Sequence, residues 1–154
     1  MLKKSVFGRA AFAKSRIGKF LAACDGAIAV EFAIVAPVFL MIVFGIVMYG
    51  SYLSVVHGVQ QLAAEAARSS VAGLSEGERS SLANSYITGN VNSYPLIDPA
   101  KLTVNAATSN SDANVFIVSV NYDASGMFIY SLPTFVPAPS STIVRSAAIP
   151  RGGY

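Results

Sequence analysis

The chain has 154 residues, of which 53% are hydrophobic and only 12% are charged. A typical soluble domain carries about 25% charged residues, so this composition excludes both an ordinary water-soluble globule and a disordered chain. The formal net charge is +3 and the sequence pI is about 9.1, values that first suggest nucleic acid or an anionic membrane as a partner. The positions of the charges decide between these partners.

The basic residues concentrate at the N-terminus. Six of the eleven Lys and Arg lie within residues 1–19, and the first acidic residue is Asp25. This basic leader runs directly into an apolar segment. We therefore interpret it as a positive-inside signal that keeps the N-terminus cytoplasmic, rather than as an RNA-binding arm. Nucleic acid is not expected as a partner.

Residues 27–49 form an apolar run of 23 residues in which Glu31 is the single charge. A bilayer core of about 30 Å needs about 20 apolar helical residues, so the run predicts a membrane-spanning helix. A helical composition continues to about Val71, with no further charge before Glu65. One helix of this extent would be about 65 Å long, roughly twice the bilayer core, so its outer half is expected outside the lipid.

Two residues break the local rules of an apolar helix. An unpaired carboxylate such as Glu31 costs about 2–3 kcal/mol at mid-span and less near an interface. Glu31 therefore either reaches back to the cytoplasmic headgroups or has a functional partner. Pro37 removes a backbone donor, leaves the carbonyl of Ala33 unpaired and predicts a kink. Ala29, Ala33 and Ala36 stand at helical spacing and would permit close approach of another helix.

A short pattern around Gly26 brings these features together. Gly26 precedes the apolar run, Glu31 follows five residues later with Phe32 beside it, and residues 33–37 read Ala-Ile-Val-Ala-Pro. Over about residues 24–68 the segment resembles a type IV prepilin-like signal. Within that group it is similar to the TadE-like family of tight-adherence (Tad, or Flp-type IVb) pilus proteins. Phe32 departs from the tyrosine that is more usual at its place in the family pattern.

This resemblance implies a minor pilin or pseudopilin that acts in the assembly of a Tad-type pilus for surface adherence. It implies that a prepilin peptidase cuts between Gly26 and Ala27 at the cytoplasmic face of the bacterial inner membrane. Glu31 and Phe32 would then serve subunit pairing, with the new amino group of Ala27 neutralising the carboxylate. The implied partners are the prepilin peptidase, other pilins or pseudopilins, inner-membrane pilus assembly components and membrane lipid.

Removal of residues 1–26 would change the character of the chain. It would take away six basic residues and Asp25 and leave a net charge of −2. It would also remove Cys24, the single cysteine, so the mature chain could form no disulfide. Residues 27–29 read Ala-Ile-Ala, which resembles a signal peptidase I site. That motif precedes the apolar core, whereas a secretory cleavage site follows it.

The C-terminal half is rich in Ser, Asn, Thr and Gly, as expected of an exported polar domain. We divide the chain into a basic leader (residues 1–26), a transmembrane and protruding helix (27–72) and an extracytoplasmic domain (73–154). Within the domain, Ser75 and Glu78 fit a capping box that begins a short helix. This helix is expected to end at about residue 92, with Leu82 and Tyr86 on one face.

Alternating apolar residues then predict strands at residues 102–106, 116–122 and 142–149, with a turn at 108–112 between the first two. The predicted fold is α+β and pilin-like, with a long N-terminal helix and a small antiparallel sheet. Three strands and one short helix cannot enclose a core alone, so the sheet is expected to lean on the outer half of the long helix. The helix residues expected at that contact are Leu53, Val56, Val59 and Gln60.

The sequence contains few residues that could carry catalysis or bind a metal. The chain holds one histidine, His57, and one cysteine, without the converging ligands of a metal site or the spacing of a nucleophilic triad. We expect no catalysis, no metal and no cofactor, and we interpret His57 as a structural or interfacial residue. The alternative from another class is an unprocessed single-span membrane anchor whose extracytoplasmic domain binds a ligand or partner. An enzyme with an unrecognised site is a third hypothesis.

Overall fold

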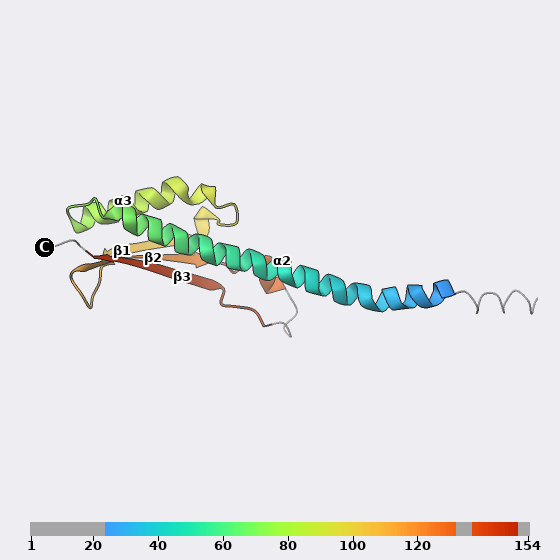
Figure 1. Ribbon diagram of the computed structural model, residues 1–154. Helices are drawn as coiled ribbons and strands as arrows, with labels where there is room; N and C mark the ends of the chain where they lie inside the picture. Colours follow the sequence, from blue (N-terminus) through green and yellow to red (C-terminus); the bar gives the residue numbers. More distant parts are fainter. Residues whose placement is uncertain (1–23, 132–136, 151–154) are drawn as a thin grey trace, which may run out of the picture. The chain divides into compact units, whose positions relative to one another are not determined.

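The computed structural model describes residues 24–131 and 137–150 (Figure 1). The chain divides into two compact units, residues 1–45 and 46–154, and the long helix α2 (Cys24–Ser70) contributes to both. The predicted leader lies almost entirely outside the described residues. The remaining elements are α3 (Glu76–Asn90), β1 (Leu102–Thr108), β2 (Val115–Asp123), β3 (Thr142–Pro150) and the short 3-10 helices η1 (Val91–Ser93), η2 (Pro99–Lys101) and η3 (Phe128–Ser131). The predicted α+β class is confirmed.

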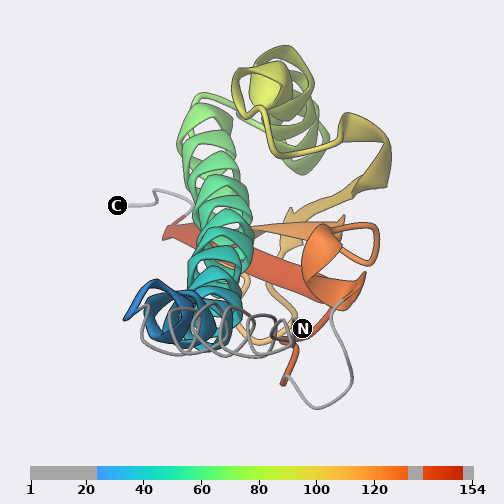
Figure 2. The same ribbon diagram turned by 90° about the vertical axis from the view of Figure 1, so that its right-hand side faces the viewer.

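The sheet is antiparallel with strand order β1-β2-β3. Its central strand carries the predicted alternation, because every second residue of β2 is buried. These buried residues are Phe116, Val118, Val120 and Tyr122. Figures 1 and 2 show the outer half of α2 running along one face of the sheet, with α3 beside it. One face of the sheet therefore forms the core, and the other face is only half-buried or exposed.

The outer half of α2 meets this core through a single stripe. Val55, Val59 and Leu62 are fully buried, and Ala63 and Ala66 continue the stripe at helical spacing. The buried side chains become smaller along the helix, from Val and Leu to Ala. The helix then ends in a tight turn, in which the backbone N–H of Gly73 donates to the carbonyl of Ser70 at 3.1 Å.

The predicted contact face of α2 was wrong in two of its four positions. Val59 is buried and Val56 is half-buried, but Leu53 is 51% exposed and Gln60 is exposed. The inner three turns of this half are apolar on most sides, so no single face stands out in the sequence. Ala63 and Ala66 are buried on the face that joins the core.

The predicted capping box begins α3. The backbone N–H of Glu78 donates to Ser75 Oγ at 3.2 Å, and the Glu78 carboxylate accepts from the N–H of Leu74 at 2.9 Å. This return bond reaches one residue further back than in the usual box. The α-helix ends at Asn90, and η1 continues the turn to Ser93, close to the predicted end at residue 92.

Leu82 and Tyr86 share one face of α3, as expected, and both are half-buried. The fully buried positions are their neighbours Ala83 and Ile87 and, in η1, Val91. The first turn of α3 also covers the open edge of β1. The Ser80 hydroxyl donates to the carbonyl of Ala106 at 3.0 Å, and Glu76 accepts from the N–H of Thr108 at 3.0 Å. Two backbone groups of an edge strand are thereby occupied.

The corrected face of α2 can be tested with two matched leucine substitutions. Leu62→Ala should lower the free energy of unfolding by about 2–5 kcal/mol, because it leaves a cavity at a fully buried position. Leu53→Ala should change it by less than about 0.5 kcal/mol, because that side chain is half exposed. Denaturant unfolding of the full chain in detergent micelles measures both. Equal losses for the two variants would contradict the assigned face.

Candidate membrane and assembly segment

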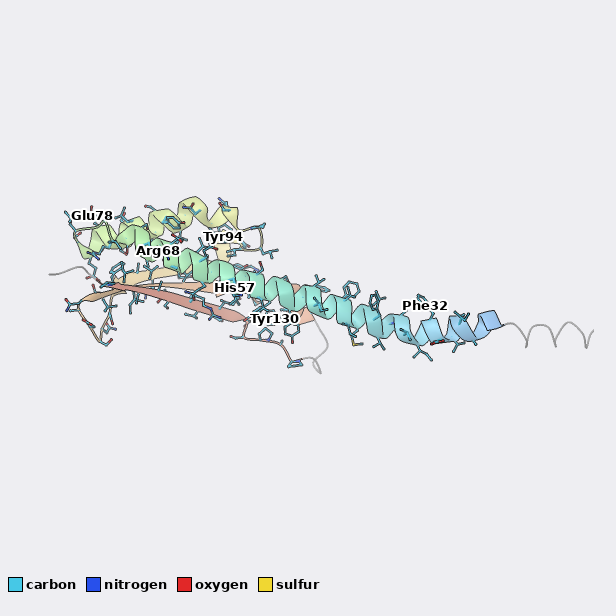
Figure 3. All side chains as sticks on the ribbon, in the orientation of Figure 1. Phe32, His57, Arg68, Glu78, Tyr94 and Tyr130 are labelled. Carbon is cyan, nitrogen blue, oxygen red and sulfur yellow. The ribbon has the colours of Figure 1, made fainter. Side chains whose placement is uncertain are left out.

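The inner half of α2, residues 26–45, is apolar on every side. Nearly all of its side chains are exposed, and Phe32 reaches 71% (Figure 3). A helix that is hydrophobic all round requires lipid or other apolar helices around it. The large apolar side chains exposed in this segment are Ile28, Val30, Phe32, Ile34, Val35, Val38, Phe39, Leu40, Met41, Ile42, Val43 and Phe44.

This segment is long and apolar enough to cross a membrane. The candidate span extends over Gly26–Ser70, and its most apolar 18-residue window has a mean hydropathy of 2.6. None of that window is buried against the rest of the chain, in contrast to the core helix of a soluble protein. The predicted membrane helix is therefore present as a helix of suitable length and composition.

Glu31 lies on the surface of this apolar segment. Its side chain is exposed, as is that of its neighbour Phe32. Within residues 24–131 and 137–150, Glu31 makes no ion pair or hydrogen bond through its carboxylate. Ala27 precedes Glu31 by four residues, so the two residues stand on the same face of α2. The side chains of Ala27 and Glu31 thus lie on one face of α2.

Gly26 stands in the first turn of α2. Its backbone is helical, and a Cβ atom added to it would meet nothing within 4 Å. Glycine in a helix costs about 1 kcal/mol relative to alanine. Neither the backbone conformation nor packing among the described residues requires glycine at this position.

The helix continues through Pro37 without interruption. Proline has no backbone N–H, so the carbonyl one turn earlier, that of Ala33, lacks its helical partner. Ala36 is half-buried, whereas the other residues of 26–44 are exposed. The predicted loosening of the helix at Pro37 stays a prediction.

A group of tyrosines that the sequence analysis missed lies at the start of the second unit. Tyr49 donates its hydroxyl hydrogen bond to the carbonyl of Pro137. Tyr52 and Tyr130 both donate to the carbonyl of Ser140, at 3.2 Å and 2.7 Å. We call Tyr49, Tyr52 and Tyr130 the tyrosine collar. Tyr49 is the last residue of the apolar run and Tyr52 follows it, a place where tyrosine is common in membrane proteins, but their partners lie 88 residues away in the sequence.

The domain offers little that points to chemistry. Among the residues that the structure describes, no group of three His, Cys, Asp or Glu side chains could hold a metal ion. His57 is exposed on α2 (Figure 3). An open groove with a volume of about 530 Å³ lies between α3 and β1, and its lining contains no charged or titratable side chain. The residues that line it are Asn84, Ile87, Thr88, Val91, Asn92, Pro99, Leu102, Thr103 and Val104.

Comparison with known families agrees with the sequence pattern. Residues 26–68 match the model of the family described as TadE-like protein. The match begins at Gly26 and ends in the last turn of α2, so it leaves α3 and the sheet outside. It confirms the resemblance drawn from the sequence and indicates a protein associated with a Tad pilus. No curated protein and no solved structure matches the chain.

Because of the tyrosine collar, the stability of the domain should decrease as the pH rises in the alkaline range. Partial burial, with smaller effects from Tyr52 and Asp123, raises the pKa of Tyr130 above its ordinary value of 10.0. The folded state therefore holds the Tyr130 proton more tightly than the unfolded state. This contribution is present below about pH 10 and is lost as the pH rises through the higher pKa of the folded state.

Tyr130→Phe should accordingly flatten the loss of stability between about pH 9 and pH 11. Loss of the hydrogen bond to Ser140 should also lower the unfolding free energy by about 1 kcal/mol at neutral pH, where the Tyr130 hydroxyl still carries the proton that it donates. At high pH the wild type loses this bond too, so the two proteins should become more alike. Denaturant unfolding at several pH values measures both effects. If the unfolding free energy of Tyr130→Phe fell with pH as steeply as that of the wild type, the raised pKa assigned to Tyr130 would be contradicted.

Proposed function

We propose that this chain is a minor pilin or pseudopilin that acts in assembly of a Tad-type pilus at the bacterial inner membrane. The observation that carries the proposal is the coincidence of the TadE-like match with a helix that is apolar all round and holds one exposed carboxylate. Such a helix suits transfer from lipid into a bundle of similar helices. The mechanism is insertion, removal of the leader, and lateral packing of α2 with sister subunits.

Leader removal is supported by the place of Gly26. The basic residues precede it, the apolar run follows it, and no contact among the described residues uses it. A glycine lets an extended backbone approach a protease closely, and the cut would lie at the cytoplasmic edge of the bilayer. The prepilin peptidase is thus the first partner, and the N-terminus of the precursor is cytoplasmic with the sheet domain on the far side.

Subunit pairing is supported by the geometry of Glu31. A charged side chain within a spanning helix costs about 2.5–3.5 kcal/mol on insertion scales. After the cut, Ala27 carries a positive amino group on the same helix face as Glu31. Opposite charges from two neighbouring helices would then meet in reciprocal pairs, which offsets the cost of placing the carboxylate in lipid. Phe32 lies beside this pair and fills apolar space between helices.

The alternative is an unprocessed single-span anchor whose domain binds a ligand or partner. The groove between α3 and β1 is the observation that favours it, because its amide and hydroxyl groups could bind an uncharged ligand. In the proposed function residues 1–26 are removed, whereas in the alternative they remain part of the chain.

The processing step predicts a defined N-terminus. Co-expressed with its prepilin peptidase, the chain should shorten by 26 residues and begin at Ala27. Gly26→Leu should block this cut. Gly45→Leu is the matched control, since Gly45 also has open space around it on the same helix, and this variant should be cut normally. N-terminal sequencing and gel mobility measure the outcome, and persistence of full-length wild-type chain would favour the anchor.

The pairing step predicts a separate defect. Glu31→Ala should leave cleavage intact yet reduce the yield of sheared pili, because the amino group of Ala27 loses its partner. Glu65→Ala is the control, since Glu65 lies on the outer half of α2, where it pairs with Arg68 at 2.7 Å. The control should pilate normally. Normal pilus yield in Glu31→Ala cells would disprove the pairing role while leaving the processing step untouched.

A further inference from the structure

The turn between α2 and α3 presents apolar side chains to solvent. Residues 71–74 read Val-Ala-Gly-Leu, and we call them the apolar turn. Leu74 is 94% exposed, more than any other large apolar side chain among the described residues, and Val71 is 55% exposed. Figure 1 shows the chain reversing its direction here, from α2 into α3. The two side chains therefore stand at one end of the sheet domain and outside its core.

The apolar turn is held in one conformation. The backbone N–H of Gly73 donates to the carbonyl of Ser70 at 3.1 Å, and that of Leu74 donates to the Glu78 carboxylate at 2.9 Å. A Cβ atom at Gly73 would lie 2.7 Å from the backbone nitrogen of Arg79, so the turn packs directly on α3. A surface that is fixed before binding loses little conformational entropy when a partner covers it.

The groove between α3 and β1, about 530 Å³ in volume, has the complementary shape and a similar polarity. The buried and half-buried residues that line it are all apolar: Ile87, Val91, Leu102 and Val104. The exposed lining residues are uncharged: Asn84, Thr88, Asn92, Pro99 and Thr103. Protein interfaces commonly combine an apolar centre with a polar rim, so this groove suits an apolar group carried by another protein.

The apolar turn and the groove lie toward opposite ends of α3. Leu74 precedes the first residue of α3 by two positions, whereas the groove is lined by the second half of the helix, from Asn84 onward. At 1.5 Å per residue, about 15–20 Å separates the turn from the groove along the helix. The apolar turn of a chain therefore cannot enter the groove of the same chain.

We propose that the apolar turn of one copy of this chain binds in the groove between α3 and β1 of a second copy, with the outer halves of α2 parallel in the two copies. Both complementary surfaces belong to this chain, and lateral packing of sister subunits brings copies side by side. The inference deepens the proposed function, on which it rests, because it names the surfaces through which the domains of sister subunits meet.

This contact is heterologous, because one copy uses its turn and the other uses its groove. Each pair keeps a free turn and a free groove, so further copies can be added, as a fibre requires. A closed dimer with two reciprocal contacts would need antiparallel α3 helices, and the outer halves of α2 would then be antiparallel too. Sister subunits inserted in one membrane in the same sense have parallel α2 helices, which favours the open arrangement.

Disulfide cross-linking tests the contact, because a disulfide requires Cα atoms within about 7 Å of each other. Cys24 is the single cysteine, so Cys24→Ser gives a background without thiols. In it, Leu74→Cys marks the turn and Thr88→Cys the groove, and both positions are exposed. Asn110→Cys is the matched control, since Asn110 is also exposed but follows β1, about 20 Å along the strand from Val104.

Membranes of cells that carry the pilus apparatus would be oxidised and separated on non-reducing gels. We expect the double variant of Leu74→Cys and Thr88→Cys to form a ladder of dimers, trimers and larger products. The double variant of Leu74→Cys and Asn110→Cys should remain monomeric. Co-expressed single variants of Leu74 and Thr88 should give dimers only, and neither variant alone should cross-link.

A ladder that stops at dimers would overturn the open arrangement. Monomers alone, or a cross-link of Leu74→Cys to itself or to a different protein, would overturn the contact between turn and groove. N-terminal sequencing of the same bands tests the proposed function separately. Chains that begin at Ala27 without a ladder would leave the processing step standing and remove the contact, whereas a ladder of chains that keep residues 1–26 would do the reverse.

Discussion

The structure depends on one constraint. The single helix α2 has two different surroundings along its length, and its residues must suit both. Up to Gly45 its large apolar side chains are exposed on all sides, and from Met48 onward one stripe is buried under the sheet. Moving twelve half-exposed apolar side chains out of water is worth on the order of 10 kcal/mol or more. The penalty of about 2–3 kcal/mol for Glu31 is small beside this gain. The cost of burying the carboxylate is therefore too small to outweigh the gain from removing the apolar side chains from water.

Local sequence patterns predicted the helices and strands because residues close together in the sequence determine where each of them forms. The capping box at Ser75 begins α3, and the alternation in β2 follows from a sheet with one buried face. The face of α2 was predicted less well, since an apolar helix gives no contrast between its sides. The buried face includes the small residues Ala63 and Ala66, and which face is buried depends on the elements that cover the helix as much as on the helix itself.

The candidate site likewise has one part that the sequence predicted and one part that it did not. Gly26, Glu31, Phe32 and Pro37 were proposed from the sequence because they form one short pattern, and all four lie within the TadE-like match. The tyrosine collar could not be found from that pattern, because the acceptors of Tyr49 and Tyr52 come from a loop 88 residues further along the chain. Only the folding of the β2–β3 connection against α2 brings these groups together.

Pro37 lies in the inner half of α2, outside the part of the helix that the core holds. The outer half of α2 is held by the core from Met48 onward, so bending there would disturb the packing of Val55 and Val59. The backbone hydrogen bond that Pro37 removes lies instead in the inner half, where no side chain is buried. If α2 changes direction anywhere, the missing backbone hydrogen bond makes Pro37 the position where bending costs least.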